Sequence, residues 1–227
     1  MRSKWIVLML GIVVAGAAGA ESFTDDFNRE DIRRTSEGSA FGTEYFIAPT
    51  GNASFQLKDG QLTTGSSGQY EDSLLVYTNF TILSSEGRSF EVAVDITYDH
   101  LNPTLSGLVF NYQNTSNYYA MRITTGMNAG TGYVQLVKVT AGKEKAIATN
   151  YITDLSNNET YRLTVSSDRI GKFTCYLVGE SVDKKATFKD LDDEFSGGYG
   201  GIYVDRAKQT GGIHFDRFFI ASTAPSL

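Results

Sequence analysis

Cysteine and histidine are scarce in this 227-residue chain, which has one cysteine and two histidines. The single cysteine, Cys175, excludes an internal disulfide framework, so the stability of the fold must come from an ordinary apolar core. Together with the widely separated His100 and His214, it provides no zinc-ligand cluster. Cys175 alternates with apolar residues, which predicts a buried core position rather than a nucleophile.

The sequence also lacks an excess of positive charge and a long apolar run in its main part. The formal net charge at pH 7 is -6. Because phosphate binding needs a basic patch, this charge predicts no nucleic-acid partner. After the first twenty residues no segment approaches 18 consecutive apolar residues, so no membrane-spanning helix is expected.

The first twenty residues have the layout of a secretory signal peptide. Arg2 and Lys4 precede an apolar run from Trp5 to Ala18, and Ala18-Gly19-Ala20 supplies a small-residue cleavage site. We therefore expect cleavage after Ala20 and a secreted or periplasmic protein. No linker or repeat divides the remainder, which predicts one domain over residues 21–227.

A period of two residues dominates the rest of the chain and predicts an all-β fold. In the segment Phe90–Tyr98, the residues Val92, Val94 and Ile96 share one face of a strand, whereas Glu91, Ala93 and Asp95 share the other. Glycine-containing turns separate about a dozen to fifteen short strands, and residues 55–62 are typical of a tight hairpin. The glycine-rich segment 197–201 is interpreted as a sheet-crossing turn, and residues 184–194 as a solvated hairpin or loop.

Seven segments along the chain resemble bacterial secreted concanavalin A-like lectin/glucanase domains. The chain is also similar to laminin-G-like modules and to domains related to 3-keto-disaccharide hydrolases. The resemblance covers nearly all of the chain after residue 20, and its motifs are mostly structural. The segments that carry it are Phe23–Arg29, Ser106–Tyr112, Asn117–Ile123, Tyr133–Val139, Tyr161–Val165, Ser196–Val204 and Ile213–Ile220.

This resemblance implies a jelly-roll sandwich of two antiparallel sheets, one of them curved. It implies that the first strand, around residues 23–27, pairs near the last strand, around residues 215–220. Ligands of such folds usually lie on the concave sheet or on its rim loops. Some relatives hold a structural calcium ion near the chain ends.

Catalysis by two carboxylates on one strand is not expected. The E-x-D-x-x-E motif of the glucanase branch is absent, and the nearest approach is Glu91 with Asp95. Four strand residues separate these two by about 13 Å, which is beyond the range of retaining and inverting glycosidases. Catalysis by carboxylates from separate strands remains an alternative. A polysaccharide lyase is another, although no lyase motif brackets either histidine.

Calcium is the metal that the residues favour, because it takes oxygen ligands in flexible geometry. Asp25 and Asp26 near one end of the chain and Asp216 near the other converge when the terminal strands pair. The alternative is that Asp25 or Asp216 caps backbone amides or pairs with Arg29 or Arg217.

Sugar binding is the function that the sequence favours. Sugars are held by planar rings that stack on them and by polar groups that replace their hydration. Arg122 is the strongest candidate, because it interrupts an otherwise apolar strand; the alternative is an ordinary polar face with tyrosines packed sideways. The predicted ligand-binding residues are Asp95, Asn111, Tyr118, Arg122, Gln135 and Tyr203.

The prediction is thus a secreted, non-catalytic carbohydrate-binding or adhesion domain that uses the concave sheet face and has a glycan or polysaccharide as its partner. Two alternatives remain. One is a glycoside hydrolase or polysaccharide lyase whose acid and base lie on separate strands, in a deep cleft. The other is an extracellular structural or protein-binding module, which requires an exposed apolar patch.

Overall fold

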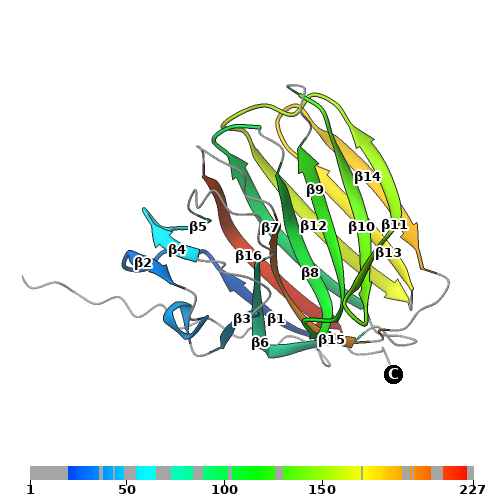
Figure 1. Cartoon of the computed structure of the whole chain (residues 1–227), viewed down its shortest axis with the longest axis horizontal. Coiled ribbons are helices and arrows are strands. Elements are labelled where there is room, and N and C mark those ends of the chain that lie inside the picture. The colour runs from blue at the N-terminus through cyan, green and yellow to red at the C-terminus, as the bar shows by residue number, and fades with distance from the viewer. Residues whose placement is uncertain are drawn as a thin grey trace, which may run out of the picture.

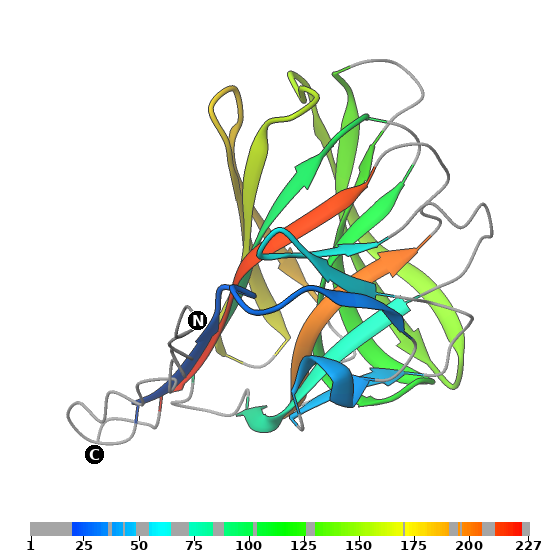
Figure 2. The same cartoon turned by 90° about the vertical axis from the view of Figure 1, so that its left-hand side faces the viewer.

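The computed structural model consists almost entirely of β-strands arranged in two stacked antiparallel sheets (Figures 1 and 2). Its described part contains sixteen strands and one short 3-10 helix, η1 (Gly38–Phe41). No helix there is long and apolar enough to cross a membrane. The structure describes residues 20–35, 38–42, 44–48, 55–64, 73–83, 89–101, 104–125, 130–169, 171–190, 195, 197–205 and 212–223.

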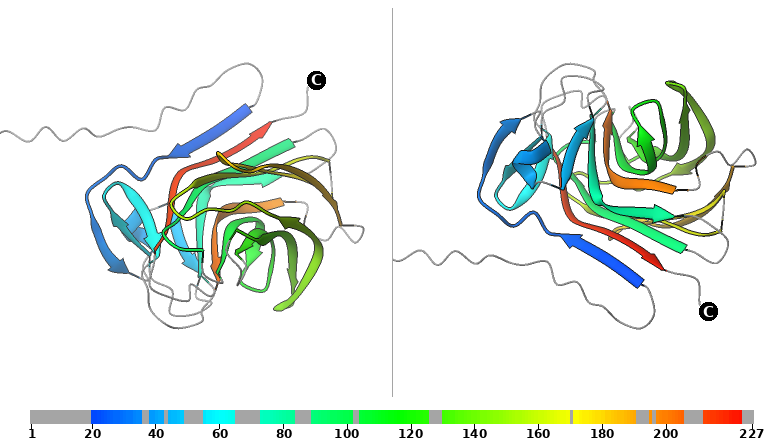
Figure 3. Two further views of the ribbon diagram at one scale, coloured as in Figure 1. Left: turned by 90° about the horizontal axis from the view of Figure 1, so that it is seen from above. Right: turned by 90° about the horizontal axis from the view of Figure 1, so that it is seen from below.

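One sheet has seven strands and is strongly curved, so that its strands curl around one another when seen along the sandwich (Figure 3). Each strand is antiparallel to its neighbours. In spatial order the strands are β11 (Lys143–Ile152), β10 (Gly132–Thr140), β9 (Asn117–Thr125), β8 (Leu105–Asn114), β15 (Gly197–Asp205), β6 (Ser73–Leu83) and β3 (Tyr45–Ala48).

The other sheet has nine strands, and the last strand of the chain lies near its middle. The spatial order is β14 (Asp183–Lys189), β13 (Lys172–Val178), β12 (Thr160–Arg169), β7 (Ser89–Tyr98), β16 (Ile213–Thr223), β5 (Gln61–Thr64), β4 (Phe55–Lys58) and β2 (Ile32–Thr35), while β1 (Ala20–Asp25) pairs with β16.

The pairing of the chain ends confirms one prediction. Strand β1 lies antiparallel to β16, with Phe23 opposite Ile220 and Asp25 opposite Phe218. The predicted signal peptide lies outside the described residues, apart from Ala20.

The core fills the space between the two sheets and follows the alternation of the sequence. Val92, Val94 and Ile96 are completely buried in it, as the period of two predicts. Removal of such side chains from water is the main favourable term in folding. Cys175 is a core residue too, with 2% of its surface exposed, and burial raises the pKa of its thiol to about 12.

A buried ion pair joins the two sheets at one end of this core. The Lys138 ammonium on β10 lies 2.8 Å from the Asp190 carboxylate, which directly follows β14. The Tyr119 hydroxyl donates a hydrogen bond of 2.6 Å to the same carboxylate. Charged groups this deeply buried are stable only when they are paired in this way.

Two turns have the backbone conformation that their residues predict. Asp59 and Gly60 connect β4 to β5 with φ of 53° and 76°, which confirms the tight hairpin over residues 55–62. Ala141 and Gly142 connect β10 to β11 in a similar way, with φ of 50° and 74°.

One prediction about local structure is wrong. Residues 197–201 are not a turn but the first half of β15, where Gly201 lies so close to β6 that a Cβ atom would be 2.2 Å from the Leu75 carbonyl oxygen. The glycines therefore allow close strand approach. Residues 184–189 belong to the edge strand β14, which is an exposed arm of a hairpin with β13 and so agrees with the predicted solvated hairpin. Residues 191–194 of the predicted segment lie outside the described residues.

Candidate functional site

A row of five residues crosses the seven-stranded sheet on its outer face, which we define as the face turned away from the nine-stranded sheet. On β9 the side chains of Tyr119, Met121 and Ile123 enter the core, so Arg122 points outward. The pairing registers then place the five residues opposite one another on β15, β8, β9, β10 and β11: Tyr203, Gly107, Arg122, Gln135 and Thr149.

Arg122 is the centre of a hydrogen-bonded cluster on this face. Its Nη1 and Nη2 donate to Glu144 Oε2 and Oε1 at 3.0 and 2.7 Å, which makes a bidentate ion pair. Nη1 also donates to the Tyr203 hydroxyl at 3.2 Å, and Nε donates to Gln135 Oε1 at 3.3 Å. The structure thus brings together three of the predicted residues, Arg122, Gln135 and Tyr203, and adds Glu144.

The contacts of Arg122 identify the outer face as concave. Tyr203 and Glu144 belong to β15 and β11, which are four strand spacings apart, or about 19 Å in a flat sheet. Their side chains nevertheless meet at the same guanidinium nitrogen. Gly107 lies between Arg122 and Tyr203 in the row and has no side chain to block the approach. The sheet must therefore curve toward this face.

Electrostatics keep this guanidinium charged. Burial alone would lower the pKa of Arg122, whose residue surface is only 7% exposed. The hydrogen bonds and charge of Glu144, with those of Tyr203, outweigh burial and raise the pKa above its usual value. Because Glu144 already neutralises it, Arg122 positions its neighbours and is not a free cation for a ligand.

The floor of the concave face is apolar rather than polar. Tyr118 is 4% exposed and packs 6.1 Å from the ring of Tyr112, as in the alternative interpretation of tyrosines packed sideways. The side chains of this concave floor form a second hydrophobic cluster: Ala48, Leu74, Val76, Val109, Tyr112, Tyr118, Ala120, Val137, Val139 and Tyr203. Tyr118 and Tyr203 therefore serve as packing residues.

An exposed pair of tyrosines lies at one end of the concave face, next to the row. Tyr133 on β10 and Tyr151 on β11 face each other, 41% and 58% exposed, with ring centroids 5.5 Å apart in an edge-to-face arrangement. We call this pair the tyrosine platform. Gln135 lies two residues along the same face from Tyr133, and its Nε2 donates to Thr149 Oγ1 at 3.1 Å.

Sequence reasoning missed the tyrosine platform, Glu144 and Thr149. One signal for Tyr133 was available, since it lies two residues before Gln135 and therefore on the same strand face. Tyr151 and Glu144 had no such signal, because only the pairing register of β11 brings them to this face.

Asn111 and Asp95 do not belong to this site. Asn111 is completely buried, and its Nδ2 donates to the Phe195 carbonyl at 2.7 Å. Asp95 lies on the outer face of the nine-stranded sheet, where Arg162 Nη1 donates to it at 3.0 Å and Arg217 forms a second ion pair. Both side chains are thus engaged away from the concave face.

The three aspartates predicted to bind calcium have protein partners instead. Asp25 accepts hydrogen bonds from the Phe27 amide and the Tyr45 hydroxyl, both at 2.8 Å, and pairs with Arg29. Asp216 accepts from the Arg217 amide at 2.7 Å. These contacts match the capping and pairing alternative.

Asp26 caps a backbone amide as well, that of Asn28, at 3.1 Å. Among the described residues, no group of three or more His, Cys, Asp or Glu side chains is arranged to hold a metal ion. Calcium binding by these aspartates therefore stays a prediction.

Two hollows lined by described residues give little support to an acid–base pair. A hollow of about 350 Å³ on the outer face of the nine-stranded sheet is lined by Glu91, with Ser89, Ser166, Phe219 and other residues that do not titrate. A second hollow of about 200 Å³, at the edge of the sandwich, has two lysines and a cysteine but no carboxylate. Neither combines a carboxylic acid with a base.

Comparisons with known proteins show the fold and nothing finer. No family model matches the chain, and no curated protein matches it. Among solved structures, the carbohydrate-binding module CBM66 from Bacillus subtilis is similar, with a TM-score of 0.54, 19% identity and coverage of 80% of this chain and 96% of that one. A Bauhinia forficata lectin in complex with GalNAc has a TM-score of 0.62, 10% identity and coverage of 90% and 99%.

A Bacteroides ovatus GH43B protein from a xyloglucan PUL is also similar, with a TM-score of 0.55 and 16% identity. The match covers 87% of this chain but only 38% of that protein. At these identities the shared property is the β-sandwich fold.

Proposed function

We propose that this protein is a secreted, non-catalytic carbohydrate-binding module that holds the apolar face of a neutral sugar ring against the tyrosine platform. The observation that carries this proposal is an exposed pair of aromatic rings beside fixed polar groups on a concave sheet. A sugar ring offers apolar C–H groups to an aromatic surface and hydroxyl groups to polar side chains, so it uses both parts of such a site.

The polar groups beside the platform are held in place before any ligand arrives. Gln135 Oε1 accepts hydrogen bonds from Arg122 Nε and from Thr124 Oγ1, both at 3.3 Å, while its Nε2 donates to Thr149. Arg122 in turn fixes Glu144, whose side chain is 44% exposed. A pre-ordered site loses less side-chain entropy on binding, which favours affinity.

The similar structures support this proposal at the level of the fold. They include a carbohydrate-binding module, a lectin in complex with GalNAc and a phage module described as CBM2. The GH43 proteins keep the enzyme alternative open. On the concave face, however, Glu144 gives both oxygens to Arg122, which leaves it poorly placed as a general acid or nucleophile.

The proposal is tested by affinity electrophoresis of residues 21–227 in gels that contain galactan, xylan, glucan or fructan. We expect retardation by at least one neutral glycan. Tyr133→Ala and Tyr151→Ala should each weaken binding about three- to tenfold, since one aromatic contact contributes about 0.5–1.5 kcal/mol. Tyr176→Ala is the matched control, because this half-buried tyrosine lies on the other sheet.

Two outcomes contradict this assignment. One is the absence of retardation by every glycan; the other is unchanged retardation of both platform variants. Incubation of the protein with the glycan that it binds tests the enzyme alternative, and new reducing ends or unsaturated products would overturn the non-catalytic role. Secretion is tested separately by expression of the full chain, with Glu21 expected as the first residue of the exported protein.

A further inference from the structure

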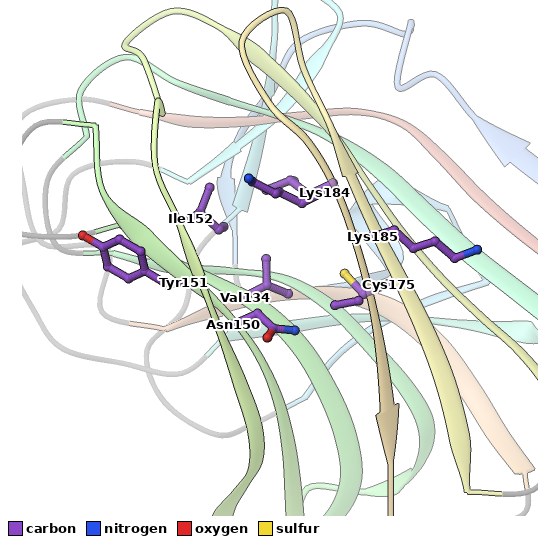
Figure 4. Close-up of a pocket in the computed structure, with 9 residues that line it drawn as sticks. Val134, Asn150, Tyr151, Ile152, Cys175, Lys184 and Lys185 are labelled. Atoms are coloured by element: carbon purple, nitrogen blue, oxygen red, sulfur yellow. The ribbon is translucent and has the colours of Figure 1, made fainter.

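A cavity opens at the edge of the sandwich, between the edge strands β11 and β14 of the two sheets (Figure 4). Its volume is about 200 Å³, and it leads from the surface to the core between the sheets. The residues that line it are Val134, Asn150, Tyr151, Ile152, Cys175, Leu177, Lys184, Lys185 and Ala186. It is separate from the tyrosine platform, because the Tyr151 ring points away from it (Figure 4).

The inner wall of this edge cavity is apolar. Val134 and Ile152 come from the seven-stranded sheet, whereas Cys175 and Leu177 come from the nine-stranded sheet, and none is more than 3% exposed. The Cys175 thiol has a pKa raised to about 12 by burial, so at neutral pH it is an uncharged and only slowly reacting part of this wall. A wall of this kind favours an alkyl chain over a polar ligand.

One charged side chain, that of Lys184, lies at the mouth of the edge cavity. Lys184 is opposite Leu177 in the β13–β14 register, so both side chains are on the inner face of the sheet. Its side chain extends over the cavity toward Ile152, whereas Lys185 points away (Figure 4). No described residue forms a hydrogen bond or ion pair with the Lys184 ammonium group, while the Lys185 ammonium lies 5.0 Å from the centre of the Tyr176 ring.

The surrounding edge is basic although the chain as a whole is acidic. Strands β11, β13 and β14 carry six lysines against two carboxylates, Glu144 and Asp183, and Glu144 is already paired with Arg122. Lysines on edge strands oppose pairing with another sheet, which accounts for the charge but not for the cavity beneath it. The same repulsion argues against a second copy of this chain as the occupant.

We propose that the edge cavity binds a short-chain alkyl carboxylate, with its alkyl chain among Val134, Ile152 and Leu177 and its carboxylate on the Lys184 ammonium group. The volume lies below the range of about 300–1,000 Å³ that is typical of sites for larger ligands, so the chain is short. This site is independent of glycan binding.

The first experiment measures binding of octanoate, octan-1-ol and octylammonium to residues 21–227 by NMR titration at pH 7.4. Octanoate should bind tightest and octylammonium weakest. Hexanoate should bind more weakly than octanoate by about fourfold for each methylene that it lacks, as expected for burial of CH₂ groups. Equal affinity for the three head groups, or no binding of octanoate, overturns the proposal.

The second experiment separates the contribution of the Lys184 charge from that of the apolar cavity. Lys184→Gln should weaken octanoate binding about three- to fivefold without affecting octan-1-ol, as for one exposed ion pair. Lys185→Gln on the same strand is the matched control and should leave both unchanged. Ala186→Leu, at a partly exposed position on an edge strand, fills the cavity and should reduce binding of both ligands at least tenfold.

A third readout uses the sole cysteine. Octanoate should slow the reaction of Cys175 with a small uncharged thiol reagent, because the bound alkyl chain would cover the part of the cavity wall that contains Cys175. Circular dichroism verifies that each variant is folded. Unchanged octanoate affinity in Lys184→Gln or in folded Ala186→Leu, or equal labelling of Cys175 with and without octanoate, would place the ligand elsewhere and overturn the proposal.

Discussion

The outer faces of the two sheets differ in what surrounds their arginines. On the concave face, the Arg122 side chain is 8% exposed and is fully engaged by Glu144, Tyr203 and Gln135. On the outer face of the nine-stranded sheet, Arg162 and Arg217 have 33% and 65% of their side chains exposed and share the carboxylate of Asp95. Both arrangements arise from the same alternation of apolar and polar residues.

Curvature explains the difference. Side chains on a concave face converge, so Val137 and Ala120 are almost completely buried although they point away from the main core. On the opposite outer face, Thr97 and Thr160 form a hydrogen bond of 2.7 Å in contact with solvent. The concave face therefore behaves as a second core with one accessible end. The other face is more polar and more exposed, although Asp95 and Ala93 on it are buried.

The largest expected effect comes from a charge placed in the concave floor. Val137, which is 1% exposed, should tolerate aspartate poorly, and Val137→Asp should lower the free energy of unfolding by about 3–5 kcal/mol because the carboxylate is buried without a partner. Thr164→Asp, at a half-buried position on the other outer face, should cost less than about 1 kcal/mol. Urea denaturation measures both, and equal costs would contradict the distinction between the faces.

A smaller effect is expected when each face loses its central charge. Arg122→Met should lower the free energy of unfolding by about 2–3 kcal/mol. It removes four hydrogen bonds, one of which is donated to the buried Tyr203 hydroxyl. Asp95→Asn should cost less, about 1–2 kcal/mol: Asp95 is itself only 3% exposed, but its partners Arg162 and Arg217 are 33% and 65% exposed and can turn toward water. The urea midpoints of the two variants compare these costs, and the reverse order would show that exposure does not decide them.

The sequence predicts which residues enter the core, because alternation depends only on the local chain. Val92 and Ile96 are examples, and the hairpin at Asp59-Gly60 follows from local backbone preferences. Alternation cannot say to which sheet a strand belongs, so Asp95 was grouped with Arg122 although the two lie on different sheets. The contact between Arg122 and Glu144 depends on sheet curvature, which no single strand encodes.

Gly107 provides a test of how the concave cluster is assembled. A Cβ atom at this position would lie 2.1 Å from the Met121 carbonyl oxygen, which is a backbone atom that cannot move alone. Gly107→Ala should therefore cost about 1–3 kcal/mol. Gly200→Ala is a gentler comparison, because its nearest contact is the flexible end of the Ile220 side chain at 2.7 Å. Thermal unfolding of both variants should show the larger loss for Gly107→Ala; a larger loss for Gly200→Ala would contradict this role of the β8 backbone.

The smallest expected change in stability comes from the loss of one carboxylate charge, and its sign should differ between the two outer faces. Burial raises the pKa of Asp216, and the nearby charges of Asp95 and Asp26 add to this effect, while the amide and charge of Arg217 oppose it. A carboxyl whose pKa is raised by folding destabilises the folded state above that pKa, and the penalty disappears as the pH falls through it. Asp216→Asn keeps an acceptor for the Arg217 amide, so it should stabilise the protein at pH 7 by about 0.5 kcal/mol or less and have no effect near pH 3.

Glu144→Gln on the concave face should instead lower stability at pH 7, because the buried guanidinium of Arg122 loses its counter-charge. Melting temperatures at pH 7 and pH 3 separate the two cases. The same sign for both variants at pH 7 would mean that one electrostatic rule governs both faces. Opposite signs would show that the concave face depends on its ion pair, whereas the other face contains a carboxylate, Asp216, whose charge is disfavoured by burial and by the neighbouring Asp95 and Asp26.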